Sequence, residues 1–256
     1  VADLEIIEQE HRGTTIAANF VEEISTALSH HVVPYWAAGV YQEVTGTDPI
    51  EAIQNGAAVG TSVAAIVVSC NALANTRRCI ESLRAACDPL LPLSLIVVDN
   101  GSTDGSAEWL REQTDLRVVC NPANHGAPRA RNQGLRLVEP GTDWIAFFDN
   151  DVFVPEGWME RALYHGTGHP EVGSIALCAN RASKLQVVSY DGPSDQASIN
   201  AFAAQHAASA LRKGEDTTLF TSLAVLVRAD VMARIGGFDE SFSPWGSLCC
   251  SNTWQS

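Results

Sequence analysis

Positive charge is scarce in this 256-residue sequence. It holds 16 Lys and Arg residues against 30 Asp and Glu residues, which gives a formal net charge of −14. Proteins that bind nucleic acid through its phosphate backbone present a basic surface instead. The composition therefore argues against general nucleic-acid binding, although an anionic nucleotide can still bind where a cation or backbone N–H groups face its phosphates.

The excess of acidic residues is concentrated at the N-terminal end. Residues 1–60 hold nine acidic residues and one basic residue, Arg12. Apolar residues recur with helical spacing between positions 16 and 28, and the segment Asp48-Pro49-Ile50-Glu51 is typical of a helix start. We expect residues 1–60 to form an acidic helical N-terminal extension without chemistry of its own, through which a protein partner can bind.

Long apolar runs and paired cysteines are also missing. No apolar run approaches the ~20 residues that a membrane-spanning helix needs, and no basic-then-apolar signal segment opens the chain. The seven cysteines form no C-x-x-C pair, and several lie in apolar segments, as buried thiols do. These features favour reduced thiols in a cytoplasmic protein, either free or peripheral at the inner face of the membrane.

Glycine-rich phosphate-binding loops are absent as well. No G-x-G-x-x-G follows the first apolar run and no G-x-x-x-x-G-K-[ST] occurs, which argues against a dinucleotide-binding Rossmann site and a P-loop. From residue 62 onward, buried-type strands alternate with helical segments. The expected strands are SVAAIVVSC (62–70), LSLIVVDN (93–100), LRVVCN (116–121) and WIAFFDND (144–151). This alternation predicts parallel β-α-β units and an α/β fold.

Polar clusters stand at the ends of three of these strands. They are Ser69-Cys70-Asn71, Asp99-Asn100-Gly101-Ser102 and Asp149-Asn150-Asp151. Open parallel sheets bind ligands beyond the carboxyl ends of their strands. We therefore expect the three clusters to line one crevice.

The third cluster places two carboxylates one residue apart after an apolar strand. Unpaired carboxylates are costly to bury, whereas Mg²⁺ is held by one or two protein carboxylates together with phosphates and water. Asp149 and Asp151 are therefore candidate ligands for Mg²⁺ or Mn²⁺ carrying a nucleotide diphosphate. The alternative is an ordinary polar turn after a strand, since a single D-x-D is a weak signal.

Five ordered segments resemble the family 2 glycosyltransferases, which are inverting enzymes of the GT-A fold. The segments are AIVVSCNALANTRRCIESL, LIVVDNGSTDGS, NHGAPRARNQGL, WIAFFDNDVFVPEGW and VRADVMARIGGFDESF, within roughly residues 62–245. The pairing of VVDNGSTDGS with GGFDE is similar to bacterial, rhamnosyltransferase-like members that build surface polysaccharides. The resemblance implies that residues 61–256 form a GT-A domain. It also implies transfer of a sugar from a UDP- or dTDP-type nucleotide-diphosphate sugar to a hydroxyl of a glycan, a lipid-linked molecule or a small molecule.

The resemblance also implies roles for particular residues. Asp151 would bind the metal directly, with Asp149 nearer the ribose or the metal's water shell. Asn132 would border the nucleotide pocket beside Arg131, and residues 236–240 would lie by the acceptor. The nucleotide-sugar site would comprise Val68, Ser69, Cys70, Asp99, Asn100, Arg131, Asp149 and Asn150.

Each of these roles has a structural alternative. Asp99, expected with Asn100 at the base and ribose, could instead cap the turn that follows it. Arg131 could be a solvated helix charge, and Asp239-Glu240 could be a surface turn. His125 fits a loop residue better than a catalytic one.

Two positions depart from the family pattern. Cys70 stands where many relatives carry an aromatic residue that stacks on the base, and Asn100 stands where many carry a second acid. An Asp would accept a hydrogen bond from the imide N–H of uracil, whereas Asn can present either its carbonyl or its amide. The nucleobase therefore stays open.

A third departure concerns the catalytic base. The family usually supplies an acidic stretch within about ten residues of GGFDESF, and inversion needs a base within hydrogen-bond reach of the acceptor hydroxyl. Residues 241–256 contain no Asp or Glu. We expect a C-terminally incomplete domain with weak transfer or only hydrolysis of the sugar donor. The alternative is a catalytically impaired, donor-binding module of an assembly. A sugar-nucleotide pyrophosphorylase is disfavoured, because its glycine- and arginine-rich loop is missing.

Overall fold

The computed structural model describes residues 61–87, 91–167, 171–182, 186–210, 217 and 220–241. The expected helical extension over residues 1–60 and most of the acid-free stretch 241–256 lie outside the described residues.

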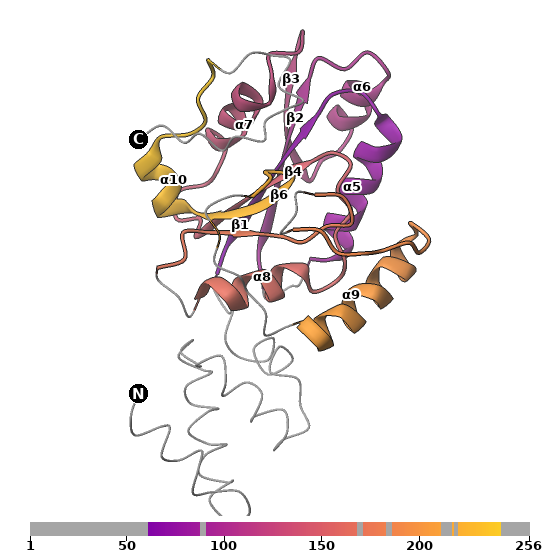
Figure 1. The fold of residues 1–256 in the computed structure, drawn as a ribbon. Helices are drawn as coiled ribbons and strands as arrows, with labels where there is room; N and C mark the ends of the chain where they lie inside the picture. Colours follow the sequence, from indigo (N-terminus) through magenta and orange to yellow (C-terminus); the bar gives the residue numbers. More distant parts are fainter. Residues whose placement is uncertain are drawn as a thin grey trace, which may run out of the picture.

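A six-stranded sheet in the order β3-β2-β1-β4-β6-β5 forms the centre of the described structure (Figure 1). The first four strands are parallel to one another, β6 runs antiparallel to β4, and β5 runs antiparallel to β6. The strands are β1 (Val63–Ser69), β2 (Leu93–Asn100), β3 (Leu116–Asn121), β4 (Trp144–Asp149), β5 (Ser174–Ala176) and β6 (Ala224–Arg228). The predicted α/β architecture is confirmed, and the four predicted strands form within about two residues of their expected bounds.

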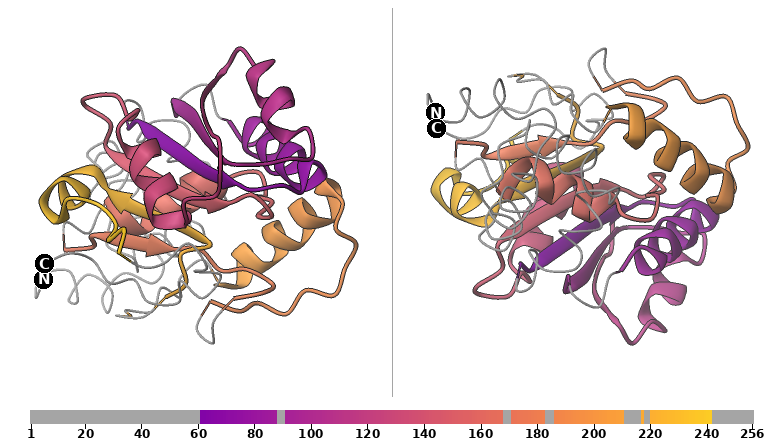
Figure 2. Two further views of the ribbon diagram at one scale, coloured as in Figure 1. Left: turned by 90° about the horizontal axis from the view of Figure 1, so that it is seen from above. Right: turned by 90° about the horizontal axis from the view of Figure 1, so that it is seen from below.

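Helices cover both faces of this sheet (Figures 1 and 2). Helices α5, α6 and α8 pack on one face, and α7 and α10 on the other. The helices are α5 (Leu73–Ala85), α6 (Ser106–Arg111), α7 (Ala127–Leu135), α8 (Trp158–Thr167), α9 (Gln196–Ala210) and α10 (Ala229–Ile235). Strands covered on both faces explain the near-continuous apolar runs in the sequence.

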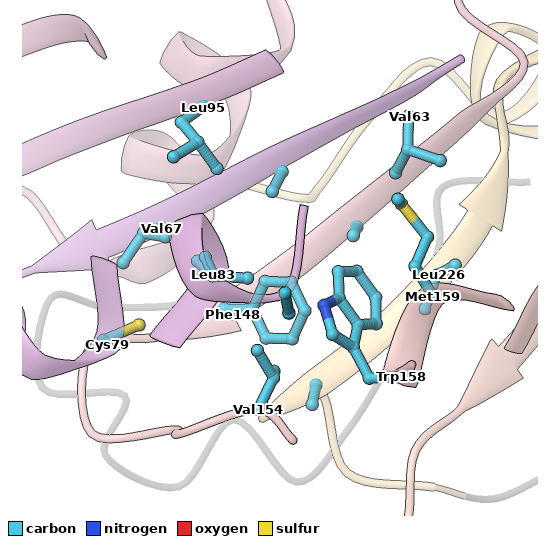
Figure 3. Close-up of a cluster of buried hydrophobic side chains, with 14 of the residues drawn as sticks. Val63, Val67, Cys79, Leu83, Leu95, Phe148, Val154, Trp158, Met159 and Leu226 are labelled. Atoms are coloured by element: carbon cyan, nitrogen blue, oxygen red, sulfur yellow. The ribbon is translucent and has the colours of Figure 1, made fainter. Parts of the chain in front are cut away.

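Two apolar clusters form the core, one on each face. Figure 3 shows the larger cluster, where the Phe148 and Trp158 rings meet edge to face with centroids 5.2 Å apart. Because successive strand residues point to opposite faces, Phe147 joins the smaller cluster beneath α7 and α10. Burial of the Phe147 and Phe148 rings on opposite faces holds the C-terminal end of β4 in place.

Helix α7 lies close to β1 because it carries a glycine at the contact. A Cβ on Gly134 would come within 2.5 Å of Ile66 Cγ2. The missing side chain permits this close approach. Arg131 lies about one turn earlier on α7, so the approach brings its side chain within reach of the C-terminal end of β4.

Candidate functional site

The expected crevice residues lie together at the C-terminal edge of the sheet. In the sheet register, Ser69 is paired with Asp99, and Val68 is paired with both Val98 and Asp149. The ends of β1, β2 and β4 therefore meet at one edge, as the parallel pattern predicts.

Arg131 neutralises Asp149 within this edge. Its Nη2 donates to Asp149 Oδ1 at 3.0 Å, and its Nη1 donates to Ser222 Oγ at 3.0 Å. The Arg131 side chain is only 4% exposed, whereas that of Asp149 is 44% exposed. The interpretation of Arg131 as a solvated helix charge is therefore wrong, because the guanidinium is buried in an ion pair.

The surroundings of Asp149 pull its pKa in opposite directions. Burial raises the pKa of Asp149 most, the Arg131 guanidinium lowers it, and the Asp151 carboxylate raises it, with a net rise. Beneath this carboxylate, the Cys79 thiol donates to the Asp149 carbonyl oxygen at 3.8 Å. Burial, with smaller contributions from Asp151 and Asp149, raises the pKa of Cys79 to about 12. Cys79 is thus an inert core thiol.

Asn150 ties the D-x-D segment to the turn between β1 and α5. Its Nδ2 donates to Thr76 Oγ1 at 2.9 Å and to the Asn71 carbonyl oxygen at 3.1 Å. Thr76 Oγ1 in turn shares a 2.8 Å hydrogen bond with Ser69 Oγ. Asp151 is exposed, and its carboxylate has no hydrogen bond or ion pair with the residues that the structure describes. Asn150 therefore fixes the segment and leaves Asp151 accessible.

The β1–α5 turn has an unusual backbone. Asn71 and Ala72 both adopt left-handed conformations, with φ of 61° and 57°. Asp104 supports the turn from the β2–α6 loop by accepting hydrogen bonds from the Leu73 N–H at 2.9 Å and the Ser106 N–H at 3.1 Å. Strained residues of this kind cluster at ligand sites. Sequence reasoning missed Asp104, because its partner lies 31 positions away.

Asp99 caps the turn after β2, as its structural alternative predicts. Its side chain is 1% exposed, and Oδ2 accepts a hydrogen bond from the Ser102 N–H at 3.1 Å. Its Oδ1 is also buried and has no hydrogen-bond partner among the described residues. A contact between Asp99 and a nucleoside stays a prediction.

The structure shows that Asn100 is buried and that both ends of its side-chain amide are hydrogen-bonded. Asn100 Oδ1 accepts hydrogen bonds from Asn121 Nδ2 at 3.0 Å and from the His125 N–H at 3.1 Å. A backbone N–H can only donate, so this contact fixes the orientation of the amide. Asn100 Nδ2 donates to Asn124 Oδ1 at 2.9 Å, and Asn124 Nδ2 donates to Cys70 Sγ at 3.4 Å. Asn124, which sequence reasoning did not single out, joins Asn100 to Cys70.

Asn132 contacts the segment at residues 237–240. Its Oδ1 accepts from the Phe238 N–H, and its Nδ2 donates to the Phe238 carbonyl oxygen and to Glu240 Oε1, each at 2.9 Å. The Phe238 ring lies edge to face on Phe147, with centroids 5.0 Å apart. The structure thus places residues 237–240 beside β4 and next to Arg131, whose guanidinium carbon lies 5.4 Å from the Phe238 ring centre.

The described residues hold neither a larger cluster of metal-ligating side chains nor a membrane-spanning helix. Among these residues, no group of three or more His, Cys, Asp and Glu side chains gathers as a metal site. Within the same part of the chain, none of the helices has the length and apolar character to cross a bilayer. Metal binding by the two carboxylates of the D-x-D stays a prediction.

Comparison with known proteins identifies the family. The model described as "Glycosyl transferase family 2" matches residues 64–195. The chain is 31% identical over 180 residues to the pre-mycofactocin glycosyltransferase of Mycobacterium tuberculosis, covering 67% of this chain and 34% of that protein. It is 29% identical over 117 residues to glycosyltransferase AglE of Haloferax volcanii, covering 43% of this chain and 38% of that protein. The chain thus spans about a third of the length of these curated relatives.

A solved structure shows the same fold. The crystal structure of residues 1–349 of S. aureus TarS superposes with a TM-score of 0.50 at 16% identity, covering 72% of this chain and 52% of the solved TarS chain. This likeness confirms the predicted GT-A fold. The matched family model, together with the 31% identical relative, shows that this chain belongs to glycosyltransferase family 2.

Proposed function

We propose that this chain carries the sugar-donor site of an inverting glycosyltransferase that uses a UDP- or dTDP-type nucleotide-diphosphate sugar. The family assignment and two relatives named as glycosyltransferases support this reaction class. The observation that carries the proposal is the ion pair between the buried Arg131 and the half-exposed Asp149, beside the exposed Asp151. It lies at the edge of the sheet where open parallel sheets bind ligands.

The D-x-D carboxylates fit a divalent cation that arrives with a diphosphate. Arg131 occupies Asp149 Oδ1, while Asp151 keeps its carboxylate accessible. Mg²⁺ and Mn²⁺ sites of this type need one or two protein carboxylates, and phosphates and water supply the other ligands. Asp151 would hold the ion, Asp149 would contact its water shell or the ribose, and the bound ion would supply charge stabilisation for the departing diphosphate.

The nucleoside side of the proposed site is the amide network around Asn100. The Asn100 carbonyl is occupied twice and Nδ2 already donates one hydrogen bond to Asn124, so any contact with the base would come from the second Nδ2 hydrogen. The carbonyl oxygens of uracil and thymine accept such a bond. The exposed Cys70, linked to Asn100 through Asn124, would lie beside the base.

The proposed reaction exchanges one bond for another at the anomeric carbon. The acceptor oxygen would form the new bond as the bond to the diphosphate oxygen breaks, and the hydroxyl proton would pass to a base. The residues that the structure describes hold the sugar donor in this scheme, since Arg131 fixes the Asp149 carboxylate and Asn150 anchors the D-x-D segment before the substrate arrives. Preorganised charge of this kind lowers barriers without reorganisation during the reaction.

Calorimetric titration of UDP and dTDP, with and without Mn²⁺, tests the proposal. We expect metal-dependent binding that Asp151→Ala weakens by about tenfold or more, the range seen when metal sites lose a supporting group. Glu81→Ala is the matched control, because it removes one exposed acid from α5. The proposal would be contradicted if neither nucleotide bound, or if the Asp151→Ala variant bound nucleotide as tightly as the wild type.

Alkylation provides a second readout in the same experiment. Bound nucleotide should slow labelling of Cys70, whereas the exposed Cys87 and Cys178 serve as internal references. Equal slowing at all three thiols would indicate a general effect on the protein rather than occupation of the crevice.

A further inference from the structure

We propose that Asn132 is a positioning residue for the transfer reaction, linking sugar-donor binding at Asp149 to the placement of Glu240. Arg131 and Asn132 are neighbours on α7, yet they hold different parts of the site. This inference rests on the proposed function, because it assumes that a nucleotide-diphosphate sugar binds beside Asp149.

The first step in the argument is the clamp that Asn132 forms on residues 238–240. One side-chain amide accepts from the Phe238 N–H and donates to the Phe238 carbonyl oxygen and to Glu240 Oε1. The two backbone contacts define the amide orientation without ambiguity. The Glu240 carboxylate is exposed, so this bond fixes a charged group that would otherwise move freely.

Gly237 is adapted to the clamp. It is buried, its φ is +115°, and a Cβ at this position would lie 2.8 Å from Asn132 Oδ1. Only glycine combines this backbone conformation with the close approach of the Asn132 side chain. A glycine at position 237 therefore allows the Asn132 side chain to bind the backbone of this segment.

The clamped segment is connected to Asp149 through two aromatic contacts. The Phe238 ring packs edge to face on Phe147, which lies two residues before Asp149 on β4. The same ring faces the Arg131 guanidinium, which binds Asp149. A ligand that engages Asp149 changes the charge around Arg131 and so acts on the Phe238 ring, whose backbone Asn132 holds.

The clamp also fixes Glu240, the last residue of the segment 238–240. Glu240 is an exposed carboxylate held by Asn132, the neighbour of Arg131 on α7, and it can accept a hydrogen bond from an acceptor hydroxyl. Asn132 thus sets the position of Glu240 without contacting the reacting atoms itself.

Two variants break the clamp from opposite sides. Asn132→Ala removes its three hydrogen bonds, and Gly237→Ala pushes against Asn132 Oδ1. Arg129→Ala, at an exposed position on α7, controls for changes to the helix. Gly141→Ala controls for positive-φ strain, since Gly141 has a φ of +87° and a Cβ there would meet no atom within 4 Å.

The measurement combines calorimetry with hydrogen exchange at residues 238–241. The ligand is Mn²⁺ with UDP or dTDP, whichever binds more tightly. In the wild type and both controls, we expect the nucleotide to slow amide exchange in this segment. In Asn132→Ala and Gly237→Ala, we expect the Phe238 amide to exchange about tenfold faster without ligand, as the loss of one or two hydrogen bonds allows. Nucleotide affinity in these two variants should fall by the same factor by which the nucleotide slows exchange in the wild type, because coupling between two sites is reciprocal.

The outcomes separate this inference from the proposed function. Normal nucleotide binding without slower exchange at residues 238–241 in the wild type would overturn the inference alone. The same ligand-linked slowing in Asn132→Ala would also overturn it, because Asn132 would then have only a structural role. Absence of nucleotide binding in the wild type would overturn the proposed function and this inference together. Asn132→Asp, which retains an acceptor for the Phe238 N–H but repels Glu240, should behave like Asn132→Ala in the ligand-linked measurement.

Discussion

Arg131 binds three groups through one guanidinium. Nη2 donates to Asp149 and to the Ser222 carbonyl oxygen, and Nη1 donates to the Ser222 hydroxyl. A methionine at this position would fill similar space but would leave Asp149 and both Ser222 oxygens without these bonds. Losses of this kind are costly, because buried polar groups need partners.

Arg131→Met should lower the free energy of unfolding by about 2 kcal/mol, less than a fully buried pair would lose, because Asp149 is half-exposed. Urea unfolding measures this change. In an Asp149→Asn background, the same substitution should cost less, since the carboxylate charge that Arg131 compensates is gone. Additive effects of the two substitutions would show that Arg131 acts mainly through Ser222.

Among the helices and strands, the packing of helix α7 on strand β1 determines where the Arg131 and Asn132 side chains lie. The helix carries Arg131 and Asn132 toward the C-terminal edge of the sheet, and Gly134 sets its distance from Ile66. Asp104 has a comparable role on the opposite face, where it holds the first residues of both α5 and α6. Loop and helix positions are therefore set by a few contacts between elements.

Gly134→Ala should destabilise the protein by about 1–2 kcal/mol, although alanine favours helices, because the new methyl group would overlap Ile66. The shift of α7 should also weaken nucleotide binding through Arg131. Urea unfolding and calorimetry measure the two effects. In an Ile66→Ala background, Gly134→Ala should lower the free energy of unfolding by less, because space for the methyl group then exists. An unchanged loss would contradict the steric explanation.

At the scale of the whole molecule, the acidic character shapes the pH dependence of stability. Hydrogen bonds hold the pKa of several surface carboxyls below the usual value of 3.8, chiefly from Ser106 at Asp104 and from Arg84 at Asp115. A carboxyl that binds its proton less tightly in the folded state stabilises the fold above its ordinary pKa, and this stabilisation is lost as the pH falls. Asp149, with a raised pKa, contributes in the opposite direction.

The free energy of unfolding should therefore decline as the pH falls from about 5 to 3. Asp115→Asn keeps the shape of the side chain but removes the charge paired with Arg84, so the decline should be shallower in this variant. Glu112→Gln, at an exposed position after α6, should leave the slope unchanged. Urea unfolding at several pH values checks this, and an equal slope for Asp115→Asn and the wild type would contradict it.

The sequence pattern predicts the first four strands, the helices between them and the edge at which their polar ends meet. These features follow from local periodicity and from the geometry of parallel sheets. It provided no comparable pattern for β5 and β6, which are three and five residues long. Three contacts become visible only in the folded chain: Arg131 is buried against Asp149, the Asn100 amide is bonded at both ends, and Asn132 holds Phe238. The physical reason is that these contacts join residues 18 to 106 positions apart, so they depend on how α7 packs on the sheet rather than on local pattern.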